Sequence, residues 1–364
     1  MIMRALTFFV AALAVALAAR VPCEAALAAP PNDRWPQLVQ RFQAEYPANG
    51  PGAYVIAAKD GKIMFSRGFG QADLENGIPL TADSVVRIAS LTKQFTSVAI
   101  LLLVEQKLLR LDEPLQDVLR NCPTAWRPLT IRQLLNQTSG LTDDLSPLYA
   151  WIATDMTADQ LLALYRPYPL MFKPGAKWHY SNLNYWILGK VIETVARAPY
   201  AEFVTHHVLV PGMTRTRYGS HGAIITGRAH GYEPDSKSGW VNARYFSATL
   251  GYSAGGFLST PTDTAIWYAA LGRGAVIAPR TLALALTEGR TSDGRPTGYG
   301  LGWYSSTING MRVAHHGGST FGFQSCVYFV PSRAVFVGVF KNSSDARGEP
   351  DEDARALLKK VMER

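Results

Sequence analysis

The sequence predicts an α+β fold, in which an antiparallel sheet made from both ends of the chain is flanked by helices and carries an inserted helical region. Three observations predict it. Strand patterns occur near the start (52–70) and near the end (321–342), a long apolar helix follows the first strands, and short helices broken by Pro and Gly fill the middle. Strands at the two ends form one sheet most economically if the ends pair. We expect a cleft where the inserted region meets this sheet, because small-molecule sites usually lie in clefts.

The first 28 residues are typical of an export signal. Arg4 precedes an apolar run from Ala5 to Ala19, and small residues up to Ala28 offer a cleavage site. The run is shorter than the roughly 20 residues of a membrane span, although a retained anchor is the alternative. We therefore expect a signal peptide over 1–28, one domain over 29–364, an exported protein (periplasmic or extracellular), and no stable membrane insertion.

The composition is that of a globular protein rather than a disordered one. Of 364 residues, 48% are hydrophobic and 18% charged, with a net charge of +8. No run of five or more basic residues occurs, so a nucleic-acid partner is not expected. The sequence does not indicate the oligomeric state.

No metal or organic cofactor is expected. The adjacent histidines at 206–207 and 315–316 do not converge on one ion, because neighbouring side chains diverge on a helix or strand. After cleavage, two cysteines remain, Cys122 and Cys326. An oxidising compartment would allow them to pair, but two cysteines are no disulfide framework, and we interpret both as structural.

The local patterns place the elements in order. Asp-Gly at 60–61 predicts a hairpin over 52–70. Apolar residues at helical spacing predict a buried helix over about 90–107, and Thr130 is placed to cap a short helix that ends at Ser139-Gly140. The buried face of the long helix comprises Phe95, Val98, Ala99, Leu102 and Leu103.

The middle of the chain, about 108–250, is expected to be mostly helical. Its clearest helix is "NLNYWILGKVIETVA", with Tyr185, Leu188, Ile192 and Val195 on one stripe. Two strand patterns around 331–333 then predict a hairpin, and "EDARALLKKVMER" predicts a terminal amphipathic helix.

Ser90 and Lys93 lie three residues apart where the long helix begins, so their side chains share one helix face. A serine is a poor nucleophile unless a base removes its proton, and a desolvated lysine with a lowered pKa is one such base. Because Ser-x-x-Lys is common by chance, the pair alone does not identify a catalytic site.

Two further segments carry polar groups. Tyr180 and Asn182 point the same way if the chain there is extended, so that the phenol can share proton transfer with the lysine and the amide can orient it or donate to a substrate carbonyl. In "AHHGGSTFGF", glycines before a strand permit close approach of a substrate, and a strand edge offers N–H groups. Taken singly, each segment is more often structural.

Together the three segments resemble, in order and type, the motifs of the serine β-lactamase and penicillin-binding protein superfamily. More narrowly, they resemble class C β-lactamases and related esterases and D-stereospecific peptidases. The motifs are Ser-x-x-Lys at Ser90 and Lys93, Tyr-x-Asn at Tyr180 and Asn182, and His-x-Gly at His316 and Gly318. The segments "LTIRQLLNQTSGL", "GYSAGGFLSTPTDTAIW" and "YGLGW" also match in order. The resemblance implies a β-lactamase/transpeptidase-like fold.

The resemblance also implies the role of each residue. Ser90 would attack an ester or amide carbonyl and form an acyl-enzyme, and Lys93 and Tyr180 would share the proton transfers, with either as the base. Backbone N–H groups of Ser90 and Ser319, beside Gly318, would form the oxyanion hole. The substrate would be positioned by Asn182 and His316.

The implied function is that of an exported serine hydrolase, either a carboxylesterase or a D-Ala-type peptidase. Its expected substrate is a small ester, amide or peptide, and a fragment derived from peptidoglycan is one candidate. Class C β-lactamases normally carry Lys where this chain has His316, and a neutral histidine attracts a carboxylate weakly. A class C-like β-lactamase of weak activity is therefore an alternative. A non-catalytic protein that binds penicillin or cell-wall fragments is another, although the retained Ser90 and Lys93 argue against it.

Overall fold

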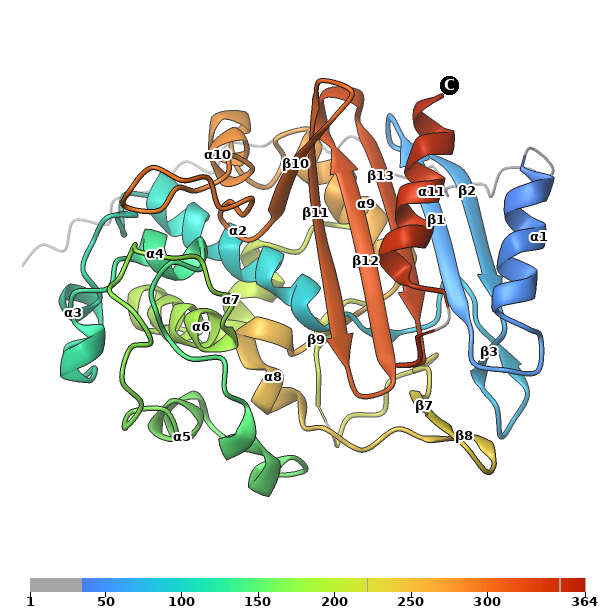
Figure 1. Cartoon of the computed structure of the whole chain (residues 1–364), viewed down its shortest axis with the longest axis horizontal. Coiled ribbons are helices and arrows are strands. Elements are labelled where there is room, and N and C mark those ends of the chain that lie inside the picture. Colours follow the sequence, from blue (N-terminus) through green and yellow to red (C-terminus); the bar gives the residue numbers. More distant parts are fainter. Residues whose placement is uncertain (1–34, 221, 347, 364) are drawn as a thin grey trace, which may run out of the picture.

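The computed structural model describes residues 35–220, 222–346 and 348–363 (Figure 1). The predicted signal peptide, 1–28, lies outside the described residues. The predicted α+β fold is confirmed: a six-stranded antiparallel sheet has the order β10-β11-β12-β13-β1-β2, so the two ends of the chain pair through β13 and β1. Its strands are β1 (Ala53–Lys59), β2 (Lys62–Phe69), β10 (Tyr304–Ile308), β11 (Met311–Thr320), β12 (Phe323–Val330) and β13 (Val335–Lys341).

The sheet has an apolar layer on each face. Along β1, Val55 and Ala57 pack with helices α1 (Pro36–Glu45) and α11 (Pro350–Met362), whereas Tyr54 and Ile56 pack on the other face. Alternate side chains of a strand point to opposite faces, which explains this division. On the second face lie α9 (Pro261–Gly272) and the helical region, and Figure 1 shows α11 and α1 on the first.

The two predicted hairpins are confirmed. The turn between β1 and β2 places Asp60 and Gly61 at φ 52° and 73°, which suits an Asp-Gly turn between twisted strands. The C-terminal hairpin joins β12 to β13 through the short helix η5 (Pro331–Arg333). The predicted terminal helix is α11, which buries Leu357 and Leu358 against the sheet.

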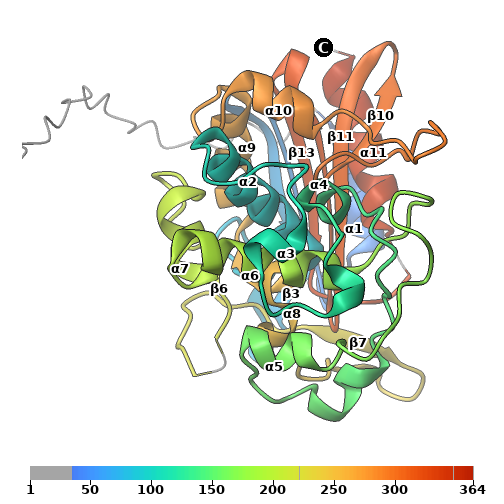
Figure 2. The same cartoon turned by 90° about the vertical axis from the view of Figure 1, so that its left-hand side faces the viewer.

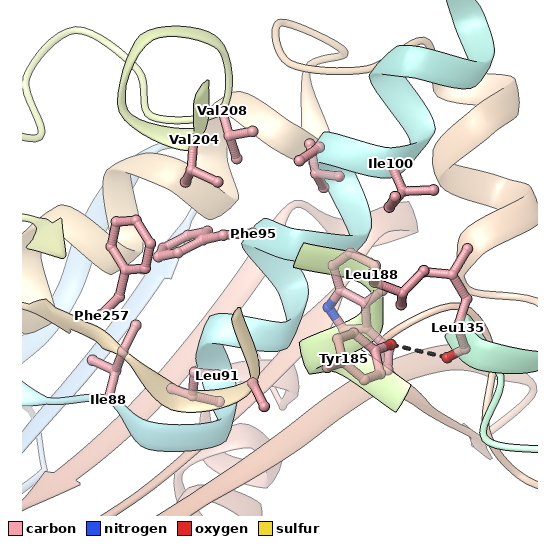
Figure 3. Packing of buried hydrophobic residues seen from close by; sticks show 14 of the residues in the cluster. Ile88, Leu91, Phe95, Ile100, Leu135, Tyr185, Leu188, Val204, Val208 and Phe257 are labelled. Atoms are coloured by element: carbon pink, nitrogen blue, oxygen red, sulfur yellow. Dashed lines mark hydrogen bonds between the residues drawn. The ribbon is translucent and has the colours of Figure 1, made fainter. Parts of the chain in front are cut away.

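The predicted long helix is α2 (Thr92–Glu105), preceded by the single turn η2 (Ala89–Leu91). It is buried over most of its length, although Leu102 is only half-buried. Figure 3 shows Phe95 of this helix facing Phe257, with ring centroids 5.5 Å apart. A helix that is apolar nearly all round belongs in the core, and its position fixes the segment that carries residues 90–93.

Helices dominate the middle of the chain, seen face-on in Figure 2. The segment also contains strands that the sequence patterns did not predict. Its helices are α3 (Leu115–Val118), α4 (Ile131–Leu135), α5 (Ala158–Ala163), α6 (Asn182–Ala196), α7 (Tyr200–His207) and α8 (Ala248–Gly255), with η3 (Thr124–Trp126) and η4 (Ser146–Trp151). Its strands are β6 (Arg217–Tyr218), β7 (Tyr232–Asp235) and β8 (Gly239–Asn242).

The remaining elements are short and join the two regions. They are β3 (Gln71–Asp73), β4 (Ile78–Pro79), β5 (Val86–Arg87), β9 (Phe257–Ser259) and α10 (Pro279–Ala285). Thr130 caps α4 as predicted, through a reciprocal pair of hydrogen bonds with Gln133, but the helix ends at Leu135 rather than at Ser139-Gly140. On α6, the stripe residue Val195 is half-buried rather than buried.

Two expectations concern the chain as a whole. Within the described ranges, no helix combines the length and apolar character needed to cross a bilayer. Cys122 is half-buried and Cys326 is buried, and both are free thiols, so the pairing that the sequence left open is not made in this structure. Cys326 instead contacts the Asp351 carboxylate at 3.6 Å.

Candidate active site

The structure brings Ser90 and Lys93 into direct contact at the start of α2. Lys93 Nζ lies 3.2 Å from Ser90 Oγ. The preceding residue, Ala89, has φ 45°, a left-handed conformation that a side chain makes unfavourable. Such strain is often found where a fold must aim a functional group, and here it occurs at the turn that presents Ser90.

The Lys93 side chain is fully buried, with an exposed fraction of 0%. Its Nζ also contacts Asn182 Oδ1 at 2.7 Å and the Ala254 carbonyl at 3.0 Å. Loss of hydration lowers the pKa of Lys93 to about 7, although the charge of Asp143 opposes this shift. Near neutral pH, therefore, a large share of the amine is neutral. Its lone pair can then accept the Ser90 proton while two N–H bonds remain on Asn182 and Ala254.

Tyr180 lines a cavity together with the same serine. The Ser90 side chain acts on the Tyr180 phenol and partly opposes the rise in its pKa, and Lys93 Nζ is 4.8 Å from the centroid of the Tyr180 ring. Burial raises the pKa of Tyr180 well above its ordinary value, so the phenol keeps its proton. Since the pKa of Lys93 is lowered and that of Tyr180 is raised, the lysine is the stronger candidate for the base.

Asn182 is the first residue of α6, and both ends of its amide are engaged. Oδ1 accepts from Lys93, while Nδ2 donates to Asp143 Oδ1 at 3.1 Å. The same oxygen of Asp143 accepts from the Asn182 backbone N–H at 2.7 Å. In this arrangement Asn182 orients the lysine, as the sequence suggested, but its amide donor is directed to Asp143 rather than to a substrate carbonyl.

His316 lies on β11 and is 2% exposed. Its Nδ1 is 2.6 Å from the Gly317 carbonyl, which only accepts, so Nδ1 carries the proton. Nε2 therefore accepts from the Tyr299 hydroxyl at 3.0 Å. Burial and the nearby Lys93 lower the pKa of His316 to about 3. The ring is thus neutral, and both of its nitrogens are engaged within the protein, so it carries no charge that would attract a substrate carboxylate.

Gly318 places the edge of β11 against the Ser90 turn. A Cβ at this position would lie 2.4 Å from the Ile88 carbonyl oxygen and 3.2 Å from the Ser90 backbone nitrogen, so only glycine permits this approach. Beside it, Ser319 lines the same cavities as Ser90. The two backbone segments expected to supply an oxyanion hole therefore meet at one place.

An apolar cavity of about 360 Å³ reaches this group of residues. It is formed by α6, α8, η4 and the turn after β11. The residues that line it include Ser90, Asn182 and Ser319 together with Leu145, Leu148, Tyr149, Ile152, Trp186, Phe246, Leu250 and Phe321. Among the described lining residues, Glu233 is the one charged side chain.

The structure adds two residues that sequence reasoning missed. Asp143 follows the short helix and turn of "LLNQTSGL", and a second aspartate beside it gave no means of choosing between them. Tyr299 lies in "YGLGW", a segment quoted for resemblance but given no role. In both cases the sequence offered one signal, a polar side chain in a loop near a motif. A loop has no periodicity that would show which way that side chain points.

Comparisons with known proteins agree with this geometry. The model of the Beta-lactamase family matches residues 37–361. A penicillin-binding protein of Bacillus subtilis (strain 168) is 28% identical over 329 residues, covering 84% of this chain and 70% of the relative. Protein flp of Staphylococcus aureus (strain N315) is 27% identical over 303 residues, and the match spans 80% of this chain but only 59% of that protein's length.

Solved structures show the same fold. The penicillin binding protein from Bacillus halodurans superposes with a TM-score of 0.76 at 26% identity, covering 89% of this chain and 98% of the other. The D-amino acid amidase from Ochrobactrum anthropi SV3, complexed with L-phenylalanine, gives a TM-score of 0.78 at 23% identity, covering 90% and 99%. The β-lactamase/transpeptidase-like fold predicted from the motifs is therefore confirmed.

Proposed function

We propose that this chain, which belongs to the beta-lactamase family of serine hydrolases, cleaves esters or amides through an acyl-enzyme on Ser90. The observation that carries the proposal is the 3.2 Å contact between Lys93 Nζ and Ser90 Oγ, made by an amine that is fully buried. A neutral amine in that position is the base that a serine nucleophile requires.

The reaction follows from the contacts of Ser90. Lys93 accepts the hydroxyl proton as Ser90 Oγ attacks the carbonyl carbon, and the carbonyl oxygen, now negative, is held by the backbone N–H groups of Ser90 and Ser319. Tyr180 passes a proton to the leaving alcohol or amine and is reprotonated from Lys93. Water then attacks the acyl carbon with the same groups in reverse, which releases the acid and restores Ser90.

The cavity indicates the class of substrate. Apolar side chains of η4, α6 and α8 surround a volume suited to a neutral aliphatic or aromatic acyl group. The carboxylate of Glu233 and the neutral ring of His316 offer no attraction for an anionic substrate. We therefore rank a carboxylesterase or a D-amino-acid-type amidase or peptidase first, and an efficient β-lactamase below them.

The relatives support these candidate substrate classes but do not choose among them. Penicillin-binding proteins and a D-amino acid amidase are among them by name. A peptidoglycan-derived peptide or amide is consistent with such relatives. We also propose that the chain is exported to the periplasm or outside the cell, as the first 28 residues indicate.

Substrate rates test the proposal. Purified protein would be assayed with p-nitrophenyl acetate, p-nitrophenyl butyrate, a D-Ala-D-Ala peptide, a D-amino acid amide and nitrocefin. We expect the highest kcat/KM for a neutral ester or amide with a larger acyl group, and little turnover of nitrocefin. Fastest turnover of nitrocefin would contradict the assigned substrate class.

A matched pair of variants isolates the cavity. Ile152 lines it, whereas Ile224 is 97% exposed and lies outside it. Ile152→Asp should lower kcat/KM for butyrate more than for acetate, because a carboxylate in the cavity disfavours apolar acyl groups. Ile224→Asp should change neither rate, and an equal effect of both variants would contradict the assignment of the cavity as the acyl site.

A further inference from the structure

A second cavity neighbours the candidate active site and is lined by two arginines without acidic partners. Arg87 is the last residue of β5, three residues before Ser90, and Arg228 lies in the loop that bridges to Val85 beside that strand. Among the described residues, neither guanidinium makes a hydrogen bond or an ion pair. Their positions are fixed by the backbone, since the Val85 N–H donates to the Gly227 carbonyl at 2.8 Å.

The cavity has a volume of about 370 Å³. Its lining is basic and polar on one side and aromatic on the other. The residues are Arg87, Arg228, Arg244, His230, Asn242, Tyr245, Phe246, Phe321 and Phe323, with backbone from 229, 231 and 243. Phe246 and Phe321, whose ring centroids are 5.8 Å apart, also line the apolar cavity that reaches Ser90, so the two cavities are neighbours.

The charge of the pair is not compensated by a carboxylate among the described residues. Loss of hydration and the positive charge of Arg228 lower the pKa of Arg87 to about 10, and the Tyr245 phenol, whose ring centroid is 5.9 Å away, opposes them. Like charges held together in a partly buried place raise the energy of the folded chain. A bound anion would remove that cost.

The carboxylates at the rim are engaged elsewhere. Glu75 lies 3.7 Å from His230 Nδ1, but its two oxygens accept from the Tyr232 hydroxyl at 2.6 Å and from Asn242 Nδ2 at 2.7 Å. Asp73, which lies near them, accepts from the backbone and side chain of its neighbour at position 76. Neither carboxylate neutralises Arg87 or Arg228.

We propose that Arg87 and Arg228 bind a doubly charged oxyanion, an inorganic phosphate or a phosphate monoester, in this cavity. Two guanidinium groups balance a charge of two, and the planar fork of arginine matches phosphate oxygens in pairs. Arg244, which also lines the cavity, adds donors. The site is separate from the group around Ser90, so its existence does not depend on the proposed hydrolysis.

Thermal unfolding tests the proposal on the whole chain. The midpoint Tm would be followed as sodium phosphate replaces sodium chloride at constant ionic strength, at about pH 8 where phosphate is mainly the dianion. Wild type would be compared with Arg228→Gln, with Arg87→Gln, and with Arg280→Gln as a control, because Arg280 is exposed and remote from the cavity. Glycerol 1-phosphate would serve as a second probe.

We expect a saturable rise of about 3 °C in wild type and in Arg280→Gln, and none in Arg228→Gln. Without phosphate, Arg228→Gln should have a higher Tm than wild type, because the repulsion on Arg87 is gone. Stronger stabilisation by glycerol 1-phosphate would point to a phosphate monoester, and equal stabilisation to the free ion, both within the proposal.

Two results would overturn it. The first is no phosphate-dependent shift in wild type. The second is the same shift in all variants, because a general salt effect on a basic protein acts on every variant alike. If Arg87→Gln fails to fold, Arg228→Gln still decides, since its side chain is not on the strand that leads to Ser90.

Discussion

Lys93 Nζ lies 2.7 Å from Asn182 Oδ1, although 89 residues separate them in the chain. The contact joins the start of the central helix α2 to the start of α6. Because Asn182 is in turn held by Asp143, a carboxylate acts on the buried amine through one intervening amide. The reactivity of Ser90 is therefore set by three segments, and each can be tested separately.

Asp143→Asn should move the acid limb of the pH profile of kcat/KM to lower pH. The negative charge of Asp143 raises the pKa of Lys93, so its removal lets the amine lose its proton at lower pH. We expect a shift of up to about one unit, with a loss of rate below about tenfold because the substituted amide can still accept from Asn182. The exposed neighbour supplies the control: Asp144→Asn should leave the limb in place. If the acid limb of Asp143→Asn stays at the same pH or moves to higher pH, the proposed effect of Asp143 on the pKa of Lys93 is contradicted.

Tyr180→Phe and Lys93→Ala should distinguish the base, which removes the Ser90 proton, from the group that passes a proton to the leaving group. If Lys93 is the base, Lys93→Ala abolishes acylation and removes the acid limb near pH 7. Tyr180→Phe should lower kcat by about 100-fold or more but keep that limb, since the phenol only passes on the proton. The measurement is the full pH profile of each variant, and loss of the limb in Tyr180→Phe alone would assign the base to the phenol.

Gly318→Ala should lower kcat/KM by about 100-fold or more, because a Cβ there meets the Ile88 carbonyl at 2.4 Å and displaces the Ser90 turn from the oxyanion-binding edge. Gly317→Ala is the matched control, since its Cβ would meet only the Ser325 carbonyl at 3.6 Å. Both variants should keep the wild-type circular dichroism. Equal losses in the two variants would show that the fit at Gly318 is not what matters.

The burial of Lys93 should also appear as a pH dependence of stability. The folded pKa of about 7 lies below the ordinary value of 10.5, so between these values the unfolded chain binds one proton more. The free energy of unfolding of wild type should therefore rise with pH across this window, relative to Lys93→Met, by roughly 3–5 kcal/mol in all. Denaturant unfolding at several pH values would measure it. A difference that is flat, or that falls with pH, would mean that the amine stays charged.

The sequence predicted those parts of the fold and site that depend on local pattern. Strand patterns at both ends predicted the sheet, and the three-residue spacing of Ser90 and Lys93 on one helix face predicted their contact. The helix that begins at Asn182 was also visible in its apolar spacing. Each of these features follows from the pattern of residues within one short segment of the chain.

The remaining features depend on where loops meet. Asp143 reaches Asn182 because two loops converge, and no periodicity marks which of two adjacent aspartates does so. The Gly317 carbonyl accepts the Nδ1 proton of His316, and Tyr299, which arrives from another loop, donates to Nε2, so the chemistry of this ring does not follow from the His-x-Gly motif. The left-handed turn at Ala89 has no sequence signal, since alanine rarely adopts that conformation.

Covalent labelling tests the central claim most directly. Wild type and Ser90→Ala would be treated with a fluorophosphonate probe and analysed by intact mass and peptide mapping. We predict one adduct on wild type, located at Ser90 within "IASLTKQF", and none on Ser90→Ala, whose circular dichroism should match that of wild type. An adduct at another serine, or equal labelling of both proteins, would contradict the assignment of Ser90 as the nucleophile.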